Sequence, residues 1–266
     1  MVMLLVSETP LYFFTLLDIL KLPALYKYRL HYAKDVSSHL GTRVYPPMSA
    51  IKAAAKNAEF NFWFAYMIPG SLGIAAANKL GIFVYDTDRE ISWKRLIKET
   101  FIITVVADLM FYGVHKAVHL PALYQTFHKK HHEWKYSMAL AHHYMTYKEA
   151  LLFSIPQALP PLLLIPFFGK QHVLSMWVGF CVTQMGAIFG HAGYRVPGLP
   201  SWSPMFRPEF HDYHHVDFDC NFAANYEFTD ALFGTLVRAP LASAAEVAKH
   251  AGERIHCYVT HKAAAA

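Results

Sequence analysis

Long apolar runs, each broken by few charged residues, dominate the chain. Five of them approach the length of about 20 apolar residues that a helix needs to cross a bilayer. The runs cover residues 3–20, 60–84, 97–114, 150–168 and 173–190. One such run alone fits a buried helix of a soluble protein, whereas five in one chain favour a membrane bundle. We therefore predict an all-α integral membrane protein with about four to five transmembrane helices.

The polar residues between the runs predict how the helices are joined. Only the sequence GKQH separates the last two runs, which predicts a tight helical hairpin. Four prolines should distort the fourth run, and neighbouring helices can tolerate such a distortion inside a membrane. They are Pro156, Pro160, Pro161 and Pro166.

Composition supports the membrane interpretation. Hydrophobic residues make up 55% of the chain and charged residues 16%, whereas soluble domains average about 25% charged residues. The net charge of +5 is modest, and the absence of a long basic run argues against nucleic acid as a partner. The three cysteines lie far apart in the sequence, which excludes a disulfide framework and a cysteine zinc site.

Charge also bears on orientation. The first run lacks a charged leading region and a small-residue cleavage site, so it does not resemble a signal peptide. Seven basic residues follow it, and the positive-inside rule then places this loop in the cytosol. They are Lys21, Lys27, Arg29, Lys34, Arg43, Lys52 and Lys56. We divide the chain into N-terminal membrane segments with a basic loop (1–98), a catalytic domain (99–238) and an Ala-rich tail (239–266), either a frayed helix or disordered.

The 17 histidines are unusual in number and in spacing. Three clusters, HKAVH, HKKHH and HDYHH, place histidines three or four residues apart, and such residues share one face of a helix. Neutral imidazole is a good ligand for iron, zinc and copper. Eight imidazoles exceed the need of one tetrahedral zinc and suit two metal ions with open positions. The eight are His115, His119, His128, His131, His132, His211, His214 and His215.

Chain topology allows these clusters to meet. An even number of predicted crossings separates them, and the fifth run returns the chain to the same face at His191. We therefore expect a histidine-rich, metal-binding helical cap on the cytosolic face. Isolated histidines are more often ordinary surface or core residues, and we assign six of them to that class. These six are His31, His39, His172, His250, His256 and His261.

The motifs HxxxH, HxxHH and HxxHH, in this order, resemble the membrane-bound fatty acid hydroxylase and sterol desaturase superfamily. The resemblance rests on residues 108–132, on HAGY at 191–194 and on residues 209–235, and it covers roughly residues 11–238. Within the superfamily, LYQTFHKKHH and DFDCNFA are similar to cholesterol 25-hydroxylase-like proteins. EFHDYHH is equally similar to methylsterol monooxygenases.

The resemblance implies a di-iron centre with the eight clustered histidines and His191 as ligands. It also implies O2 as co-substrate, NAD(P)H-derived electrons delivered by cytochrome b5 or a reductase, a sterol or other lipid substrate, and residence in the endoplasmic reticulum. The chain departs from the family at Lys116, where arginine is usual. It also departs at Thr146 and Tyr147, where many methylsterol oxidases have His-Pro. A ligand from that region is therefore absent or supplied by His142 or His143.

Nearby acidic and aromatic residues are predicted to support the site. Asp108, Glu209 and Asp212 are candidates to accept the second ring N–H of a ligand histidine and fix its tautomer. For Asp108, a simple hydrogen bond between helices has equal weight. Aromatic residues beside the clusters either line the substrate path or pack in the core, with packing the commoner outcome. They are Phe111, Tyr112, Tyr124, Phe127, Trp134, Tyr213, Phe218 and Phe222.

Several functions remain open at this point. The leading hypothesis is an O2-dependent di-iron sterol hydroxylase. Alternatives of the same class are C4-methylsterol oxidation, sterol C5 desaturation and hydroxylation of a fatty acyl lipid. A histidine-rich membrane transporter or metal-binding protein would instead spread ionisable residues through the spans. An inactive scaffold is the last alternative, and it rests on Thr146 and Tyr147.

Overall fold

The computed structural model describes residues 2–30, 46–80, 85–87, 90–133, 137–195 and 207–239. Helices dominate these residues, and the described strands are two short segments, β1 (Tyr85–Asp86) and β2 (Gln171–His172), paired in parallel. The prediction of an all-α membrane protein is confirmed. Residues 31–45 of the predicted basic loop and residues 240–266 of the Ala-rich tail lie outside the described residues.

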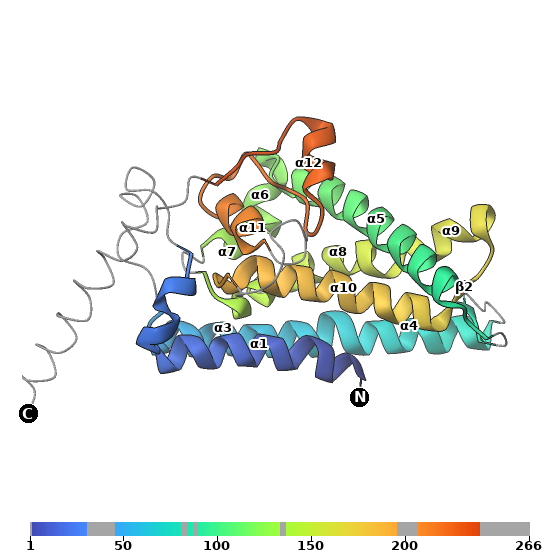
Figure 1. The fold of residues 1–266 in the computed structure, drawn as a ribbon, viewed down its shortest axis with the longest axis horizontal. Coiled ribbons are helices and arrows are strands. Elements are labelled where there is room, and N and C mark those ends of the chain that lie inside the picture. Colours follow the sequence, from blue (N-terminus) through green and yellow to red (C-terminus); the bar gives the residue numbers. More distant parts are fainter. Residues whose placement is uncertain are drawn as a thin grey trace, which may run out of the picture.

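Five long helical segments run lengthwise through the molecule and alternate in direction (Figure 1). Each corresponds to one apolar run of the sequence. They are α1 (Val2–Leu20), the continuous rod α3 (Met48–Asn61), η2 (Phe62–Met67) and α4 (Ile68–Lys79), α5 (Trp93–Val118), the pair α8 (Tyr147–Ala158) and α9 (Pro160–Phe168), and α10 (Val173–Ala192).

Three of these segments are long and apolar enough to cross a membrane, namely Trp93–Val118, Tyr147–Phe168 and Val173–Ala192. This count refers to the described residues alone, and all five predicted runs are helical.

Local sequence explains where the helices begin and end. Ser92 caps α5 by accepting a hydrogen bond from the Arg95 N–H, a role that suits serine at a helix start. The predicted proline distortion is confirmed, because α8 ends just before Pro160, the first residue of α9. The predicted hairpin is confirmed too, since only four residues, Gly169 to His172, connect α9 to α10. Gly193, with φ of 70°, ends α10 in the left-handed region that favours glycine.

Short helices form a cap at the end of the bundle where α5 and α10 finish (Figure 1). An apolar core between α1, α3 and α10 lies beneath them and includes Leu11, Phe14, Ile51, Leu140 and Ile188. The cap elements are η1 (Pro23–Tyr28), α6 (Pro121–Phe127), α7 (Lys129–His132), η3 (Ala139–His143), α11 (Pro208–His214) and α12 (Glu227–Phe233).

Candidate metal centre

Nine histidines gather under the cap in two adjacent groups, and they are the nine that the sequence singled out. In each group, one ring nitrogen from every histidine lies within 4.8 Å of those of all the other members. Seven of the nine side chains are buried, and two are half-buried. The first histidine group consists of His115, His119, His128, His132 and His214. The second histidine group consists of His131, His191, His211 and His215.

Helix geometry divides each HxxHH motif between the two groups. His131 and His132 are consecutive on α7, so their side chains leave the helix about 100° apart and enter different groups. The same holds for His214 and His215 at the end of α11. His191, at the end of α10, joins the second group. The two HxxHH motifs thus tie both groups to the same short helices.

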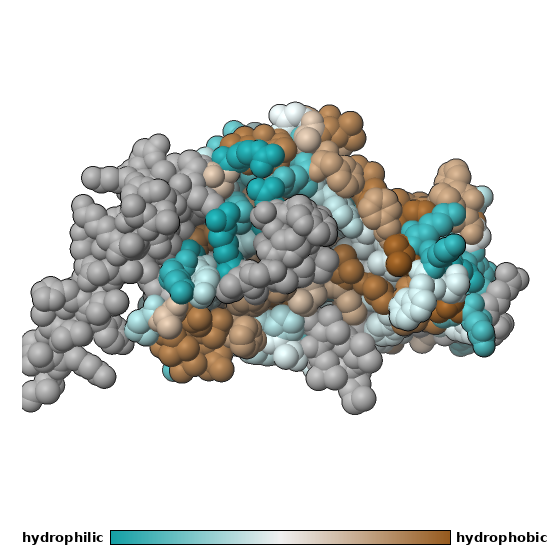
Figure 2. Space-filling view, in the orientation of Figure 1, coloured by the Kyte–Doolittle hydropathy of each residue, from teal (hydrophilic) through white to brown (hydrophobic). Residues whose placement is uncertain are grey.

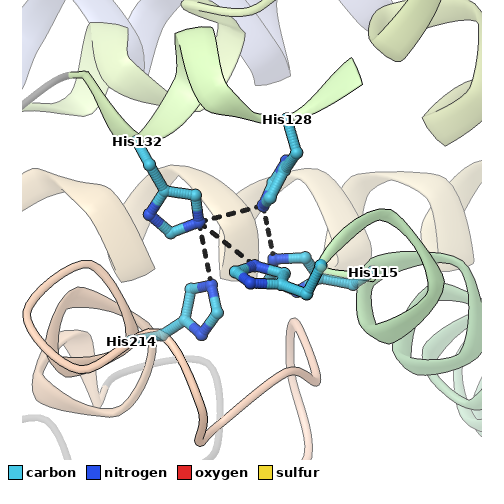
Figure 3. A group of neighbouring side chains, drawn as sticks. His115, His128, His132 and His214 are labelled. Carbon is cyan, nitrogen blue, oxygen red and sulfur yellow. Dashed lines mark hydrogen bonds between the residues drawn. The ribbon is translucent and has the colours of Figure 1, made fainter. Parts of the chain in front are cut away.

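Nitrogen spacing in both groups fits a shared cation. In the first group the Nε2 atoms of His128 and His132 are 3.0 Å apart, and those of His132 and His214 are 3.2 Å apart (Figure 3). In the second group the Nε2 atoms of His191 and His215 are 3.1 Å apart. Two ligands at about 2.1 Å from one ion, 90° to 110° apart, are separated by about 3.0–3.4 Å.

The second ring nitrogens fix which tautomer several histidines adopt. Nδ1 of His115 donates to the Phe222 carbonyl at 2.6 Å, and Nδ1 of His128 donates to Glu149 Oε1 at 2.5 Å. In the second group, Nδ1 of His131 and of His191 donate to the carbonyls of Tyr144 and Ala187. A neutral imidazole carries a single N–H, so the Nε2 atoms of these four rings hold lone pairs.

In each group two such lone pairs therefore face each other. The Nε2 atoms of His115 and His128 are 3.0 Å apart, and those of His131 and His191 are 3.3 Å apart. Neither pair has a proton to share, so the contact is repulsive unless a cation lies between the nitrogens. These residues fit a pair of metal ions, and imidazole is a ligand that iron, zinc and copper accept.

Burial keeps these rings neutral. It lowers the pKa of His119 to about 4 and the pKa of His131 to about 3. Both rings are thus unprotonated at neutral pH, the state in which imidazole binds a metal.

The acceptors of the ring N–H groups are mostly backbone carbonyls, and this corrects the prediction for Asp108. Asp108 accepts hydrogen bonds from the backbone N–H groups of Ala224 and Asn225, at 3.1 and 2.7 Å, and from the Thr229 hydroxyl at 2.7 Å. It therefore secures the segment that carries the Phe222 carbonyl rather than binding a ring itself. The alternative of a structural hydrogen bond between elements is the one that the structure supports.

The other two predicted acceptors, Glu209 and Asp212, lie in different surroundings. Glu209 pairs with Arg195 at 2.8 Å and lies 3.7 Å from Arg207, so it faces arginines and not the ring N–H of a ligand histidine. Asp212 is buried on α11 between His211 and His214. Its role as a hydrogen-bond acceptor for a ligand stays a prediction.

Glu149 is the supporting residue that sequence reasoning did not assign. It is fully buried in the first turn of α8 and binds His128. Its signal in the sequence was an acid at the very start of an apolar run, three residues after the helix-capping Thr146. The backbone acceptors left no such signal, because every residue carries a carbonyl.

His142 and His143 lie beside the second group without joining it. Both are buried in η3, and the His142 ring centroid is 5.7 Å from that of His191. Thr146, at a departure from the family pattern, caps α8 by accepting from the Glu149 N–H. The chain therefore uses this position for helix capping.

A narrow cavity reaches both groups from the side of the membrane helices. Phe111 of α5, Phe153 and Gln157 of α8, and Tyr66 of η2 line it together with His115 and other group members. Its volume is about 30 Å³, which is room for one or two water molecules.

Most of the aromatic residues singled out in the sequence do not line this cavity. Phe111 does, whereas Tyr112 and Phe222 belong to a separate buried cluster. The Phe218 ring packs 4.3 Å from the His132 ring, centroid to centroid. Trp134 lies outside the described residues. Packing is thus the observed role of Tyr112, Phe218 and Phe222.

The N-terminal segment is bound directly behind the second group by a buried ion pair. Arg29 contacts Asp18 at 2.5 Å and donates to the Ser137 carbonyl at 2.9 Å. The Tyr194 hydroxyl donates to the same Asp18 oxygen at 3.0 Å. Tyr194 follows His191 by three residues, so this ion pair fixes the end of α10 that carries a member of the group.

Comparison with known proteins agrees with this geometry. The sequence model of the family described as fatty acid hydroxylase matches residues 100–235, which include all nine histidines. Human fatty acid hydroxylase domain-containing protein 2 is 33% identical over 46% of this chain and 33% of its own length.

Two plant enzymes are similar to the chain as well. The very-long-chain aldehyde decarbonylase GL1-8 of rice (Oryza sativa) is 30% identical over 54% of this chain and 53% of its own length. Methylsterol monooxygenase 1-2 of Arabidopsis thaliana is 30% identical over 54% of this chain and 48% of its own length. The chain thus spans about half or less of these relatives, and no solved structure matches it. The family match covers just over half of the chain, and the chain belongs to the fatty acid hydroxylase family.

Proposed function

We propose that the chain is an O2-dependent lipid hydroxylase whose two histidine groups hold a pair of iron ions. One observation carries the proposal. In each group, the Nε2 lone pairs of two histidines face each other, those of His115 and His128 in the first group and those of His131 and His191 in the second. Two reduced iron ions would bind O2 and supply an oxidant strong enough for an unactivated C–H bond.

The protein positions the ligand nitrogens and limits the access of water to the metal site. Carbonyls and Glu149 hold the ring N–H groups, which keeps the Nε2 atoms directed inward before a metal binds. The cavity reaches the groups between membrane helices, and its wall includes Phe111 and Phe153, whose ring centroids are 4.9 Å apart. A cavity of about 30 Å³ admits no lipid, so a substrate must displace side chains of the cavity wall to reach the metals.

A sterol is the proposed substrate, with hydroxylation as the reaction. The similarity to a methylsterol monooxygenase supports this choice, and C4-methyl oxidation, C5 desaturation and fatty acyl hydroxylation are its alternatives. The similarity to an aldehyde decarbonylase adds long-chain aldehydes to the substrates that need testing.

Setting and electron supply complete the proposal. Residues 99–238 form the catalytic part and residues 1–98 support it, in the membrane of the endoplasmic reticulum with the cap facing the cytosol. Cytochrome b5 or a reductase supplies NAD(P)H-derived electrons there. The nine histidines lie at the ends of α5 and α10 and on or beside α7 and α11, and these elements meet at one end of the bundle (Figure 1). This placement supports an enzyme over a transporter.

The decisive experiment combines metal analysis with isotope labelling. The protein is purified in detergent, its metals are quantified, and the reduced protein is incubated under labelled oxygen with sterols, acyl lipids and long-chain aldehydes. We expect about two iron ions per chain and labelled oxygen in the product from at least one sterol. Fewer than about one metal per chain, or no labelled product from any lipid, would refute the proposal and favour an inactive scaffold.

Two substitutions sharpen this experiment. His131→Ala should abolish activity and remove metal from the second group. His172→Asn is the matched control, because His172 caps α10 at the far end of the bundle by accepting from the Leu174 N–H, and asparagine also caps helices well. Bound zinc does not decide the question, since zinc competes well with ferrous iron at nitrogen sites.

A further inference from the structure

A second cavity lies at the other end of α5, away from the metal groups. It has a volume of about 350 Å³ and lies between the start of α5 and the end of α9. Twenty residues of α5 separate Arg95 in this cavity from His115, which corresponds to roughly 30 Å along a helix. This length equals the thickness of a bilayer's hydrocarbon core. The cavity and the metal groups therefore lie at opposite membrane boundaries.

The surroundings of this cavity are those of a membrane interface. Trp93, beside it at the start of α5, is 79% exposed, and Phe167, near the end of α9, is 78% exposed. Tryptophan is enriched where the headgroups of a bilayer begin, and lysine near the end of a membrane helix anchors it there. Figure 2 shows hydrophilic and hydrophobic side chains side by side at this end of the molecule.

Two lysines give the cavity its positive charge. Lys94 and Lys98 are exposed, lie one turn apart on α5 and both line the cavity. The positive charge of Arg95 is already compensated, because its guanidinium contacts Glu99 at 2.6 Å and Asp86 at 3.4 Å. Cations in the first turns of a helix oppose its dipole, so helix stability does not explain the lysines. The helix start and the lysines together attract an anion.

A buried side chain adds a requirement for a hydrogen-bond donor. Gln171 lines the cavity and is 2% exposed. Its Nε2 donates to the Gly169 carbonyl, and its Oε1 has no partner among the described residues. An amide oxygen only accepts hydrogen bonds. A ligand that satisfies it must carry an N–H or O–H group close to its negative charge.

The remaining wall of the cavity is apolar. Ile102 and Leu164 line it on the side of the membrane core, and the Phe168 ring lies 5.8 Å from Lys98 Nζ. From these features we infer that the cavity binds the headgroup of a membrane phospholipid, with its phosphate at Lys94 and Lys98. An ammonium or hydroxyl group of the headgroup donates to Gln171, and the first acyl carbons lie against the apolar wall.

The test measures the melting temperature of the full-length protein in detergent as short-chain phospholipids are added. Phosphatidylethanolamine and phosphatidylglycerol carry N–H or O–H donors, whereas the choline group of phosphatidylcholine carries none. We expect the first two lipids to stabilise the protein at lower concentration than phosphatidylcholine does. Gln171→Leu should remove this preference and leave phosphate binding in place.

Lysine variants test the phosphate contact. Lys94→Ala with Lys98→Ala should weaken the binding of all three lipids by about 30-fold, and arginine at both positions should restore it. The control is Lys52→Ala with Lys56→Ala, another exposed pair one turn apart, on α3 at the metal end. An equal loss of lipid binding in the control variant would show that any surface lysine attracts these lipids, and it would overturn the inference. Equal stabilisation by inorganic phosphate, or none by any lipid, would overturn it as well.

Discussion

Glu149 allows the strongest test of how the protein prepares its metal groups. It is fully buried, and its Oε1 accepts the Nδ1–H of His128 at 2.5 Å. Its Oε2 has no partner among the described residues, so truncating the side chain acts mainly through His128. Glu149→Ala leaves a buried N–H without an acceptor, which costs about 1–3 kcal/mol. Loss of such a partner typically lowers metal affinity 10–100-fold, a similar free energy.

The effect should be confined to one group, because His128 belongs only to the first. Metal-free protein is titrated with Co²⁺, and the two binding steps are fitted separately. Glu149→Ala should weaken one step 10–100-fold and leave the other unchanged. Glu149→Gln keeps an acceptor but loses the charge, so its effect should be intermediate.

Glu133→Ala is the matched control, since Glu133 is an exposed acid one residue after His132 and its loss changes the net charge equally. Wild-type affinity for both ions in Glu149→Ala would refute the reasoning. Equal weakening of both steps together with a lower melting temperature would assign Glu149 to general folding instead.

Three further predictions concern pH, packing and the N-terminal ion pair. Burial lowers the pKa of His131 to about 3. As the pH falls, this histidine is therefore protonated in the unfolded chain before it is protonated in the folded one, and metal-free protein should be most stable above pH 6.5. Its free energy of unfolding, followed by acid titration, should fall by about 1.4 kcal/mol per pH unit for each such histidine, and a flat profile would contradict this. Gly186→Ala places a methyl group into the Asn225 amide and should lower the free energy of unfolding, measured by chemical unfolding, by about 1–3 kcal/mol. Gly113→Ala, whose methyl group meets open space, should cause no loss. Equal effects of the two variants would show that Asn225 does not approach Gly186 closely. Asp18→Ala removes the carboxylate that forms the buried ion pair with Arg29 and should cost about 3–5 kcal/mol. The double variant Asp18→Leu, Arg29→Met should be closer to wild type in melting temperature; a double variant as unstable as the single one would be inconsistent with a charge effect.

The sequence alone determined the helical membrane class and the set of histidines. Both follow from local patterns, because apolar runs of sufficient length have few alternatives to a membrane helix and three-and-four spacing places imidazoles on one face. The proline break before Pro160 was predictable for the same reason, since proline acts on its own helix.

Only the tertiary structure decided how the histidines divide and what holds them. Helix phase alone separates His131 from His132, but the distant histidines that each one meets depend on how the other segments pack. The acceptor for His115 is the backbone of Phe222, 107 residues away, and a carbonyl has no residue type to recognise. Asp108, for which the sequence left a ligand role and a structural hydrogen bond equally open, holds the loop that supplies this carbonyl. Helix phase can be read from spacing, whereas the partner of a buried polar group depends on which distant segment packs against it.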